Sequence, residues 1–381
     1  MHRSRPAQKR GDRRGFALAL ALMGIVLIAT LISGAYFMSQ QEFRSGRNQL
    51  TEQRAFSAAE YGMGSAVKRF DKVNNLQMAF GAVTTPDTVQ AGGGAFAVVR
   101  TTRVNEFTYS ATSEGYAGGT NAQVAAVRKI NEILRIARPS FDVRGALTVN
   151  GPVSVQGSSK VNGNDSIPDQ WKTSSICPVP GAGLPGVAAP DTGAVTGDTK
   201  IFGTPPKVED PAAADTNTYF KYGDESWNTL TANADIVLPG GNYSTAPTVI
   251  GSACNKADVT NWGDTFRTTP CDDYFPIIYI KGSIKLNAGS IGQGILLVEG
   301  DLEMTGGFEF VGIAIVRDDI KVRGTGNKVS GAVFAGNQYI SDNTSVSGNA
   351  EIRYSSCGID RALKGASTVV RAKQRGWSEI F

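Results

Sequence analysis

The chain has 381 residues, a formal net charge of +4 and a single histidine, His2. Six of its 38 basic residues and one of its 34 acidic residues precede Phe16, which leaves 32 basic and 33 acidic residues and no excess of positive charge for a nucleic-acid-binding surface. One histidine near the N-terminus also excludes catalysis by a histidine-activated nucleophile in the bulk of the chain.

Residues 16–38 form the most apolar segment, with 23 consecutive residues that carry no charge. As an α-helix at about 1.5 Å per residue this segment spans roughly 35 Å, enough to cross a hydrocarbon core of about 30 Å. A cleaved signal peptide is the alternative, but its apolar core has about 7–15 residues, and Ser33-Gly34-Ala35 is a poor cleavage site. Residues 1–15 are a basic leader, which favours a cytoplasmic N-terminus with the rest of the chain across the membrane.

Residues 39–70 are predicted to continue the same helix outside the membrane. Apolar residues recur at spacings of three and four, as on one helix face, at Phe56, Ala59, Met63, Ala66 and Phe70. No proline interrupts residues 16–70, which favours one helix of about 50 residues. A break near Ser39 with two separate helices is the alternative that the sequence leaves open.

These two stretches carry a resemblance to a known family. RRGFALALALMGIVLIATLISGAYF, which starts at Arg13, and RAFSAAEYGMGSAV at 54–67 resemble the N-termini of PilX-type pilus assembly proteins, relatives of type IV pilins. The resemblance covers about the first 70 residues, and its AAE stretch at 58–60 is similar to the extramembrane helix of the family. It implies that a prepilin peptidase cuts between Gly15 and Phe16 and that the apolar segment is retained.

The resemblance also implies partners and a location. The retained helix is expected to contact the lipid bilayer and to pack with helices of other pilin-like subunits. The protein would be a single-pass protein of the bacterial inner membrane, with its C-terminal bulk periplasmic or extracellular. One departure is Leu20, because major pilins have a glutamate at the fifth position after the cut, although PilX-type proteins often lack it. A glutamate in lipid needs a partner, so a chain with leucine there can rest as a monomeric anchor.

Residues 71–140 are predicted to form a small β-rich, pilin-like unit. AFAVVRTTRV (95–104) and EFTYSATSEGYA (106–117) are rich in β-branched and aromatic residues, which favours two strands. NAQVAAVRKINEILRIAR (121–138) fits both a helix and an alternating strand. By analogy with pilin-like proteins, in which a helix packs on a sheet, we expect it to be the third strand of a meander.

Residues 276–348 contain a repeat of 18 or 19 residues. Its four lines, PIIYIKGSIKLNAGSIGQ, GILLVEGDLEMTGGFEFV, GIAIVRDDIKVRGTGNKVS and GAVFAGNQYISDNTSVSG, begin at Pro276, Gly294, Gly312 and Gly331. Apolar residues align between the lines: Ile277 with Ile295, Ile313 and Ala332; Ile284 with Leu302, Ile320 and Tyr339; Leu286 with Met304 and Val322. A period near 20 with two-residue alternation predicts a β-solenoid with apolar residues inside and polar residues outside.

The fold class predicted for the whole chain is α+β: a long transmembrane helix, a small antiparallel sheet and a right-handed β-solenoid over residues 276–363. FDVRGALTVNGPVSVQGSSKVNG (141–163) has the same pattern and is expected to supply the first coil or coils, and residues 349–363 the last. Residues 164–275, rich in Pro, Gly, Asp and Thr, are expected to be an irregular insertion. Residues 364–381 are expected to be a C-terminal tail.

All four cysteines, Cys177, Cys254, Cys271 and Cys357, lie in the part expected outside the cytoplasm, where disulfides persist. Their number is even and none belongs to a CxxC pair, so we expect disulfides rather than a zinc site. Cys254 and Cys271 enclose a short polar loop and are the favoured pair, which leaves Cys177 with Cys357. Three pairings are compatible with the sequence, which does not choose between them.

Candidate catalytic or metal-binding groups are few. Asp318 and Asp319, beside Arg317, are paired acids of the kind that bind calcium or cleave sugars. They fall at a turn between two strands of one repeat, as residues 299–301 do one repeat earlier, and acids at such turns are usually solvated caps. We therefore expect no catalytic residue, no metal and no cofactor.

The insertion holds the remaining candidates. The acids at 272–273 receive the same interpretation as those of the repeat. Trp171, Trp227 and Trp262 either form a sugar-binding or protein-binding patch or fix an irregular loop on the solenoid, and the second interpretation is favoured.

Three functions fit these features. The favoured one is a structural component of a type IV pilus or pilus-assembly complex, such as a minor pilin, whose exported solenoid serves interaction or adhesion and which is no enzyme. The second is a membrane-anchored carbohydrate-binding or carbohydrate-cleaving β-helix, which needs a row of acids and aromatics across several coils that the repeats do not show. The third is a bactofilin-like scaffold, which needs exposed apolar terminal coils and faces the cytoplasm. The ligand of the solenoid is not specified by the sequence.

Overall fold

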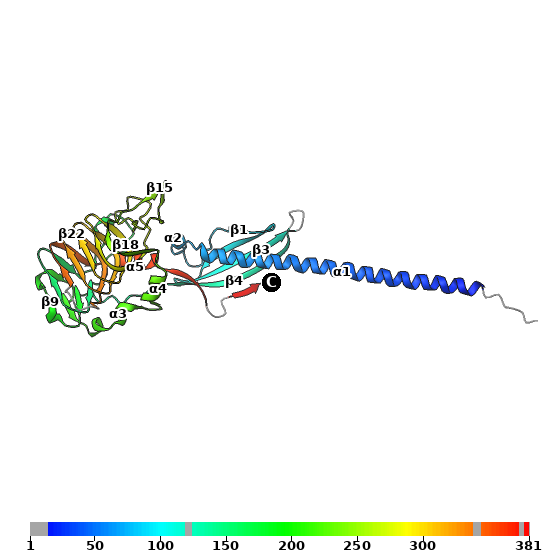
Figure 1. Cartoon of the computed structure of the whole chain (residues 1–381), viewed down its shortest axis with the longest axis horizontal. Helices are drawn as coiled ribbons and strands as arrows, with labels where there is room; N and C mark the ends of the chain where they lie inside the picture. Colours follow the sequence, from blue (N-terminus) through cyan, green and yellow to red (C-terminus); the bar gives the residue numbers. More distant parts are fainter. Residues whose placement is uncertain (1–13, 119–123, 338–343, 373–376, 381) are drawn as a thin grey trace, which may run out of the picture.

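The structure is a computed structural model that describes residues 14–118, 124–337, 344–372 and 377–380. It contains a long helix, an antiparallel sheet that packs on the second half of this helix, and a large curled parallel sheet (Figure 1). The first half of the helix projects from the rest of the molecule as a rod, and the parallel sheet lies at the opposite end.

α1 (Arg14–Lys68) is a single helix of 55 residues, about 80 Å long at 1.5 Å per residue. It runs past Ser39 without a break, so the alternative of two separate helices is wrong. Its continuity has a simple cause, because the segment contains no proline and its glycines lie singly among strong helix formers. A one-turn helix, α2 (Lys72–Asn75), follows it.

Four consecutive strands form an antiparallel meander beside α1: β1 (Asp87–Gly92), β2 (Ala95–Arg103), β3 (Thr108–Gly118) and β4 (Val124–Ala137). The ambiguous segment 121–138 contains β4, which is the strand that we expected. β1 is a strand that the sequence pattern does not predict, and three glycines with positive φ, at 92–94, lead from it into β2. In β2 and β3 buried and half-buried residues alternate, because one face of these strands lies on α1.

The C-terminal segment returns to this sheet. β25 (Thr368–Arg371) and β26 (Trp377–Ile380) both pair antiparallel with β4, so the expectation of a tail at 364–381 is wrong. The return covers backbone N–H and C=O groups that β4 would otherwise leave unpaired at a sheet edge. Trp377 also packs edge-on against Phe56 of α1, with the ring centroids 6.1 Å apart.

The parallel sheet winds into coils whose strands stack in three ladders. The first ladder contains β14 (Ile236–Tyr243), β17 (Ile277–Leu286), β18 (Ile291–Val298), β20 (Glu309–Val316), β22 (Thr325–Ala335), β5 (Leu147–Val149), β8 (Val187–Ala189) and β11 (Lys207–Glu209). The second runs from the C-terminal parts of β14 and β17 through β19 (Leu302–Thr305), β21 (Ile320–Arg323), β23 (Thr344–Val346), β6 (Val153–Val155) and β9 (Val195–Thr196). The third joins the N-terminal parts of β18, β20 and β22 to β24 (Asn349–Tyr354), β7 (Lys160–Asn162) and β10 (Ile201–Phe202). This arrangement is solenoid-like, as the repeat predicts.

The register between the coils is also the predicted one. Ile277 pairs with Ile295, Ile295 with Ile313, and Ile313 with Ala332. Two further predicted columns pair as well, namely Ile284, Leu302 and Ile320, and Leu286, Met304 and Val322. Tyr339 lies outside the described residues. A fixed coil length keeps equivalent residues in stacked positions, which is why the sequence alignment of the repeats also describes their pairing.

The order of the coils differs from the order of the chain. β5, β6 and β7, which we expected in the first coil, pair instead with β22, β23 and β24 beside the last repeat. β8, β9 and β10 add a further coil, so the insertion 164–275 is not wholly irregular, contrary to expectation. The chain thus enters the stack in its middle, proceeds to one end, reaches the other end at β14 and winds back to its entry point.

The central part of the first ladder, formed by β18, β20 and β22, is buried on both faces. Ile278 and Leu296 belong to the core inside the coils, whereas their neighbours Ile295 and Ile313 belong to a second core outside them. This outer core is covered by α5 (Ser356–Gly365) and by aromatic residues of the insertion. The expectation of a polar outer face is therefore wrong for this part of the ladder. The second half of the expected last coil forms the covering helix instead.

The remaining elements are short: η1 (Asp169–Trp171), η2 (Thr192–Ala194), η3 (Asp198–Lys200), η4 (Pro211–Ala214), α3 (Asn217–Phe220), β12 (Lys221–Tyr222), β13 (Glu225–Ser226), α4 (Trp227–Ala232), β15 (Val249–Ile250) and β16 (Ala253–Cys254). Two disulfides fix the segments that cover the parallel sheet. Cys177 is bonded to Cys357 of α5, and Cys254 of β16 is bonded to Cys271, in the segment that precedes β17. These are the pairs that the sequence favours.

Candidate functional site

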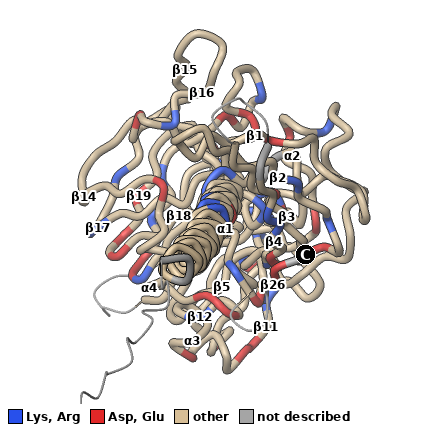
Figure 2. Tube along the Cα trace, turned by 90° about the vertical axis from the view of Figure 1, so that its right-hand side faces the viewer, with Lys and Arg blue, Asp and Glu red and all other residues tan. Residues whose placement is uncertain are grey.

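The first half of α1 is an apolar surface that no other segment covers within the part of the chain that the structure describes. Large side chains more than half exposed lie all along it, at Leu18, Leu20, Leu22, Met23, Ile25, Val26, Leu27, Ile28, Leu31, Ile32, Tyr36, Phe37 and Met38. Its most apolar window has a mean hydropathy of 2.4 and is 0% buried, so by length and composition the helix can cross a membrane. Figure 2 looks along α1 and shows a run of turns without charged residues. Each leucine or isoleucine contributes about −0.3 to −0.6 kcal/mol to insertion into lipid, so the helix is more stable there than in water.

The second half of α1 is a packing surface of small residues. Ala55, Ala58 and Ala59 are buried against the antiparallel sheet, and Met63 fills the space beside them. Glu60, one position after the buried alanines, is exposed. The predicted apolar face of this half is confirmed, so one helix combines a segment suited to lipid with a segment fixed to a folded unit.

The predicted cleavage site lies at the start of the described chain. Gly15 and Phe16 belong to the first turn of α1, whereas residues 1–13 of the leader lie outside the described residues. Leu20, at the position where major pilins have a glutamate, is 57% exposed among apolar neighbours. Cleavage between Gly15 and Phe16 stays a prediction.

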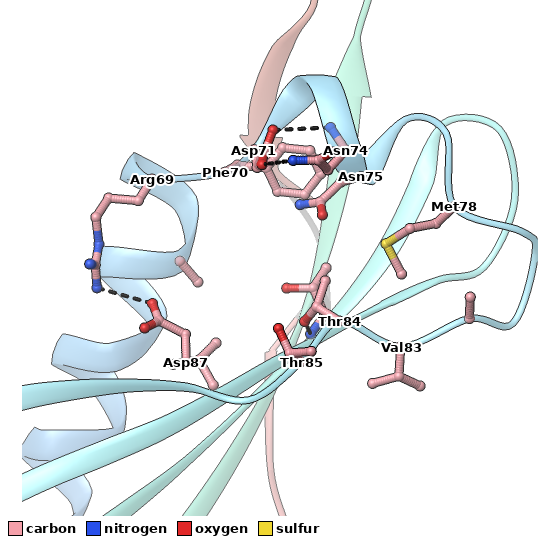
Figure 3. Close-up of a pocket in the computed structure, with 14 residues that line it drawn as sticks. Arg69, Phe70, Asp71, Asn74, Asn75, Met78, Val83, Thr84, Thr85 and Asp87 are labelled. Atoms are coloured by element: carbon pink, nitrogen blue, oxygen red, sulfur yellow. Dashed lines mark hydrogen bonds and ion pairs between the residues drawn. The ribbon is translucent and has the colours of Figure 1, made fainter. Parts of the chain in front are cut away.

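A groove with a volume of about 490 Å³ opens where α1 ends, beside α2 and the start of β1. Figure 3 shows Arg69 paired with Asp87 at 3.2 Å on one side, and Asp71 accepting hydrogen bonds from the backbone and side chain of Asn74 on the other. Both carboxylates thus contact groups of the groove's own lining. Apart from these two aspartates the lining holds no acid, and it holds no histidine or cysteine. The groove therefore provides no recognisable catalytic or metal-ligand set.

The acidic pair at the turn after β20 is buried rather than solvated. Asp318 and Asp319 are 8% and 0% exposed, and with Asp301 one coil earlier they place carboxylate oxygens within 4.8 Å of one another. Burial, assisted by the charges of Asp318 and Asp301, raises the pKa of Asp319 to about 6. The expectation of solvated caps is wrong, because the corners of stacked coils cover one another. The repeat aligns Asp301 with Asp319, 18 residues later, but the sequence analysis does not predict that the two carboxylates lie close together.

The acids that follow Cys271 form separate ion pairs. Asp272 lies 2.9 Å from Arg267, and Asp273 lies 2.6 Å from Arg361 of α5. The structure does not bring them together with the acids of the repeat as one carboxylate cluster. They hold the loop before β17 against its neighbours.

The three tryptophans of the insertion are buried, at 0%, 5% and 0% exposed for Trp171, Trp227 and Trp262. Trp171 and Trp227 belong to the outer core, and Trp262 belongs to the core inside the coils. The indole N–H of Trp171 donates to the carbonyl of Thr265, and that of Trp262 to the carbonyl of Val259. The alternative that these residues form a binding patch on the surface is therefore wrong. They fix the insertion on the solenoid, as the favoured interpretation has it.

Together, the fold and the exposed helix define a class of protein: one apolar helix that carries a small antiparallel sheet and a disulfide-linked, solenoid-like sheet. No protein-family model matches the chain, and no curated protein matches it in sequence. Among solved structures, the crystal structure of the competence-associated pilin ComZ from Thermus thermophilus matches 87% of this chain and 97% of that chain. The sequence identity is 13% and the TM-score is 0.22, a value too low to support an argument about fold or function.

Proposed function

We propose that the protein is a pilin-like structural component of a type IV pilus or of a pilus-assembly complex, anchored in the bacterial inner membrane by α1. The N-terminus lies in the cytoplasm, and the sheet and solenoid lie on the periplasmic or extracellular side. The observation that carries the proposal is α1 itself, an unbroken helix that is apolar and exposed in its first half and packed on a sheet in its second. The PilX-type resemblance of the first 70 residues supports the same assignment.

The role that we propose is mechanical and not catalytic. The exposed half of α1 packs among the helices of other pilin-like subunits or against lipid, and both environments cover the same apolar side chains. The solenoid, which we expect to be right-handed, presents a stiff surface for interaction or adhesion.

Contacts between the antiparallel sheet and the solenoid support this role. Arg138, just after β4, lies 2.7 Å from Asp360 of α5. The chain also connects the two parts twice, once after β4 and once before β25. A force applied to the solenoid therefore reaches α1 through paired strands and not through one flexible linker.

The test is mass spectrometry of the mature N-terminus in the native host. We expect a chain that starts at Phe16, because the proposal requires a prepilin peptidase to remove the leader. Gly15→Leu is expected to block the cut, and Gly11→Leu, which alters the other glycine of the basic leader, is the matched control that leaves it unchanged. A start near Tyr36 would indicate ordinary secretion, and an intact Met1 a plain anchor. Both results contradict the pilin route.

A further inference from the structure

Three carboxylates meet at one corner of the solenoid, between the first and the second ladder. Asp301 precedes β19, and Asp318 and Asp319 precede β21, which pairs with β19 in the next coil. The repeat therefore places Asp301 and Asp319 at the same position of adjacent coils, and the backbone N–H of Asp319 donates to Oδ1 of Asp301 at 3.2 Å. Oxygen atoms of all three side chains lie within 4.8 Å of one another.

A lysine and a threonine contact two of the carboxylates at this corner. Nζ of Lys321 lies 3.4 Å from Oδ2 of Asp301, and the hydroxyl of Thr344 donates to Oδ1 of Asp319 at 3.3 Å. Oδ2 of Asp319 is buried and has no hydrogen-bond partner in the structure described. An ionised oxygen without a partner is costly inside a protein, and a cation bound to this atom would offset that cost.

A second buried oxygen without a partner occurs in the next coil. Asn337 follows β22, as Asp318 follows β20, and its backbone N–H donates to the carbonyl of Asp318 at 3.4 Å. The side chain of Asn337 is 7% exposed, and its Oδ1 atom also has no hydrogen-bond partner in the structure described. Both oxygen atoms without partners thus belong to the same column of coil corners.

We propose that Asp301, Asp318 and Asp319 bind a calcium ion that joins adjacent coils of the solenoid. Calcium prefers carboxylate and carbonyl oxygens, takes six to eight of them and tolerates irregular geometry. Magnesium demands a near-ideal octahedron and retains its waters, which suits a buried corner less well. Zinc prefers nitrogen and sulfur ligands, and the three side chains offer oxygen alone. The site is independent of the proposed role in a pilus.

The experiment measures calcium bound to the full-length protein in detergent. The chain is stripped with EDTA, dialysed against calcium chloride and then against calcium-free buffer, and its calcium content is measured by mass spectrometry of the elements. We expect about one ion per chain and a melting temperature that rises by a few degrees with calcium. Asp319→Asn is expected to remove both effects, because it replaces a ligand charge while keeping the shape of the side chain.

Asp224→Asn is the matched control, because it makes the same substitution at a carboxylate that is 74% exposed and paired with Arg135. It is expected to keep the bound ion. Asp301→Asn is a second variant that decides the question if Asp319→Asn does not fold. Wild-type protein without bound calcium, and with the same melting temperature in calcium and in EDTA, would overturn the proposal and indicate a proton on Asp319 instead. Equal or tighter binding of magnesium chloride would overturn the assignment to calcium.

Discussion

Gly115 of β3 lies directly against the backbone of α1: a Cβ atom at this position would stand 2.0 Å from the carbonyl oxygen of Ala55 and 2.4 Å from the amide nitrogen of Ala59. Gly62 of α1 makes the reciprocal contact, because a Cβ there would lie 2.5 Å from the Cβ atom of Ala97 in β2. These two close approaches explain why the helix presents alanine and glycine to the sheet. They fix the direction of the apolar rod relative to the rest of the molecule.

We expect Gly115→Ala to destabilise the helix–sheet unit by about 1–3 kcal/mol, the usual cost of overpacking, because backbone atoms cannot rotate away from the added methyl group. Gly46→Ala is the control, since this exposed glycine of α1 has open space around it and alanine favours a helix by up to about 1 kcal/mol. Thermal unfolding of the full-length protein in detergent, followed by circular dichroism, measures both. Equal melting temperatures of Gly115→Ala and the wild type would contradict the close packing.

The two disulfides are expected to differ in their contribution to stability. Cys177–Cys357 spans 180 residues and Cys254–Cys271 spans 17. Because the entropy lost by the unfolded chain grows with loop length, the longer link is expected to stabilise by about 5 kcal/mol and the shorter by about 3 kcal/mol.

The measurement compares two double variants, Cys177→Ala with Cys357→Ala and Cys254→Ala with Cys271→Ala, by denaturant unfolding. The first variant should lose more stability, and α5, which carries Cys357, should become sensitive to proteolysis. A larger loss for the shorter link would show that native packing around Cys254 and Cys271, and not chain entropy, determines the effect.

Asp169 joins the covering layer to the wall of the solenoid. Arg353 of β24 donates two hydrogen bonds to it, at 3.1 and 2.8 Å, and Lys328 of β22 donates another at 3.2 Å. The hydrogen bonds from Arg353, followed by those from Lys172 and Lys328, hold the pKa of Asp169 well below its usual range. Its pKa is therefore lower in the folded than in the unfolded chain. The resulting stabilisation is present above about pH 4 and decreases as the pH falls toward the folded value.

Asp169→Asn is accordingly expected to lower stability at pH 7 by about 1 kcal/mol, a modest value because the carboxylate is partly exposed. The difference from the wild type should shrink between pH 4 and pH 2, as measured by denaturant unfolding at several pH values. Asp224→Asn, which changes an exposed ion pair, should have almost no effect at any pH. A difference for Asp169→Asn that stays constant with pH would show that shape and not charge is responsible.

The sequence predicts what recurs along the chain and misses what depends on distant partners. The register of Ile277, Ile295 and Ile313 follows from the repeat, because each coil repeats the same local geometry. The position of Val153–Val155 beside Thr344–Val346 does not, because strands of three residues carry too little pattern to specify a neighbour. The strand Thr368–Arg371 is missed for the same reason, since only the unpaired edge of β4 selects it.

The sequence predicts part of the burial in the solenoid. The apolar runs at 295–298 and 313–316 lack alternation, which is typical of strands buried on both faces, and thus indicate the outer core. The burial of the carboxylates is harder to predict, because an acidic residue at a turn can equally well be exposed to solvent. Only the spacing of one repeat between Asp301 and Asp319 indicates that the coils stack them.

Trp262 packs at the β14 end of the core inside the coils. Its carbonyl accepts a hydrogen bond from the backbone of Gln293 at 2.8 Å, and a Cβ at Gly292 would lie 3.1 Å from its ring. Trp262→Ala is expected to cost about 3–5 kcal/mol, because the cavity would open the end of the stack to water. Phe266→Ala, at a side chain 45% exposed, is the control and should cost much less.

Hydrogen exchange distinguishes such a cap from a general core residue. In a stack of coils stability depends on neighbouring units, so Trp262→Ala should accelerate exchange in β17 and β18 more than in β8 and β9, which lie toward the other end. Faster exchange in all coils alike would mean that the stack unfolds as one unit. Unchanged exchange in β17 and β18 would contradict the capping role. It would show that loss of the indole does not make the coil at the β14 end more accessible to water.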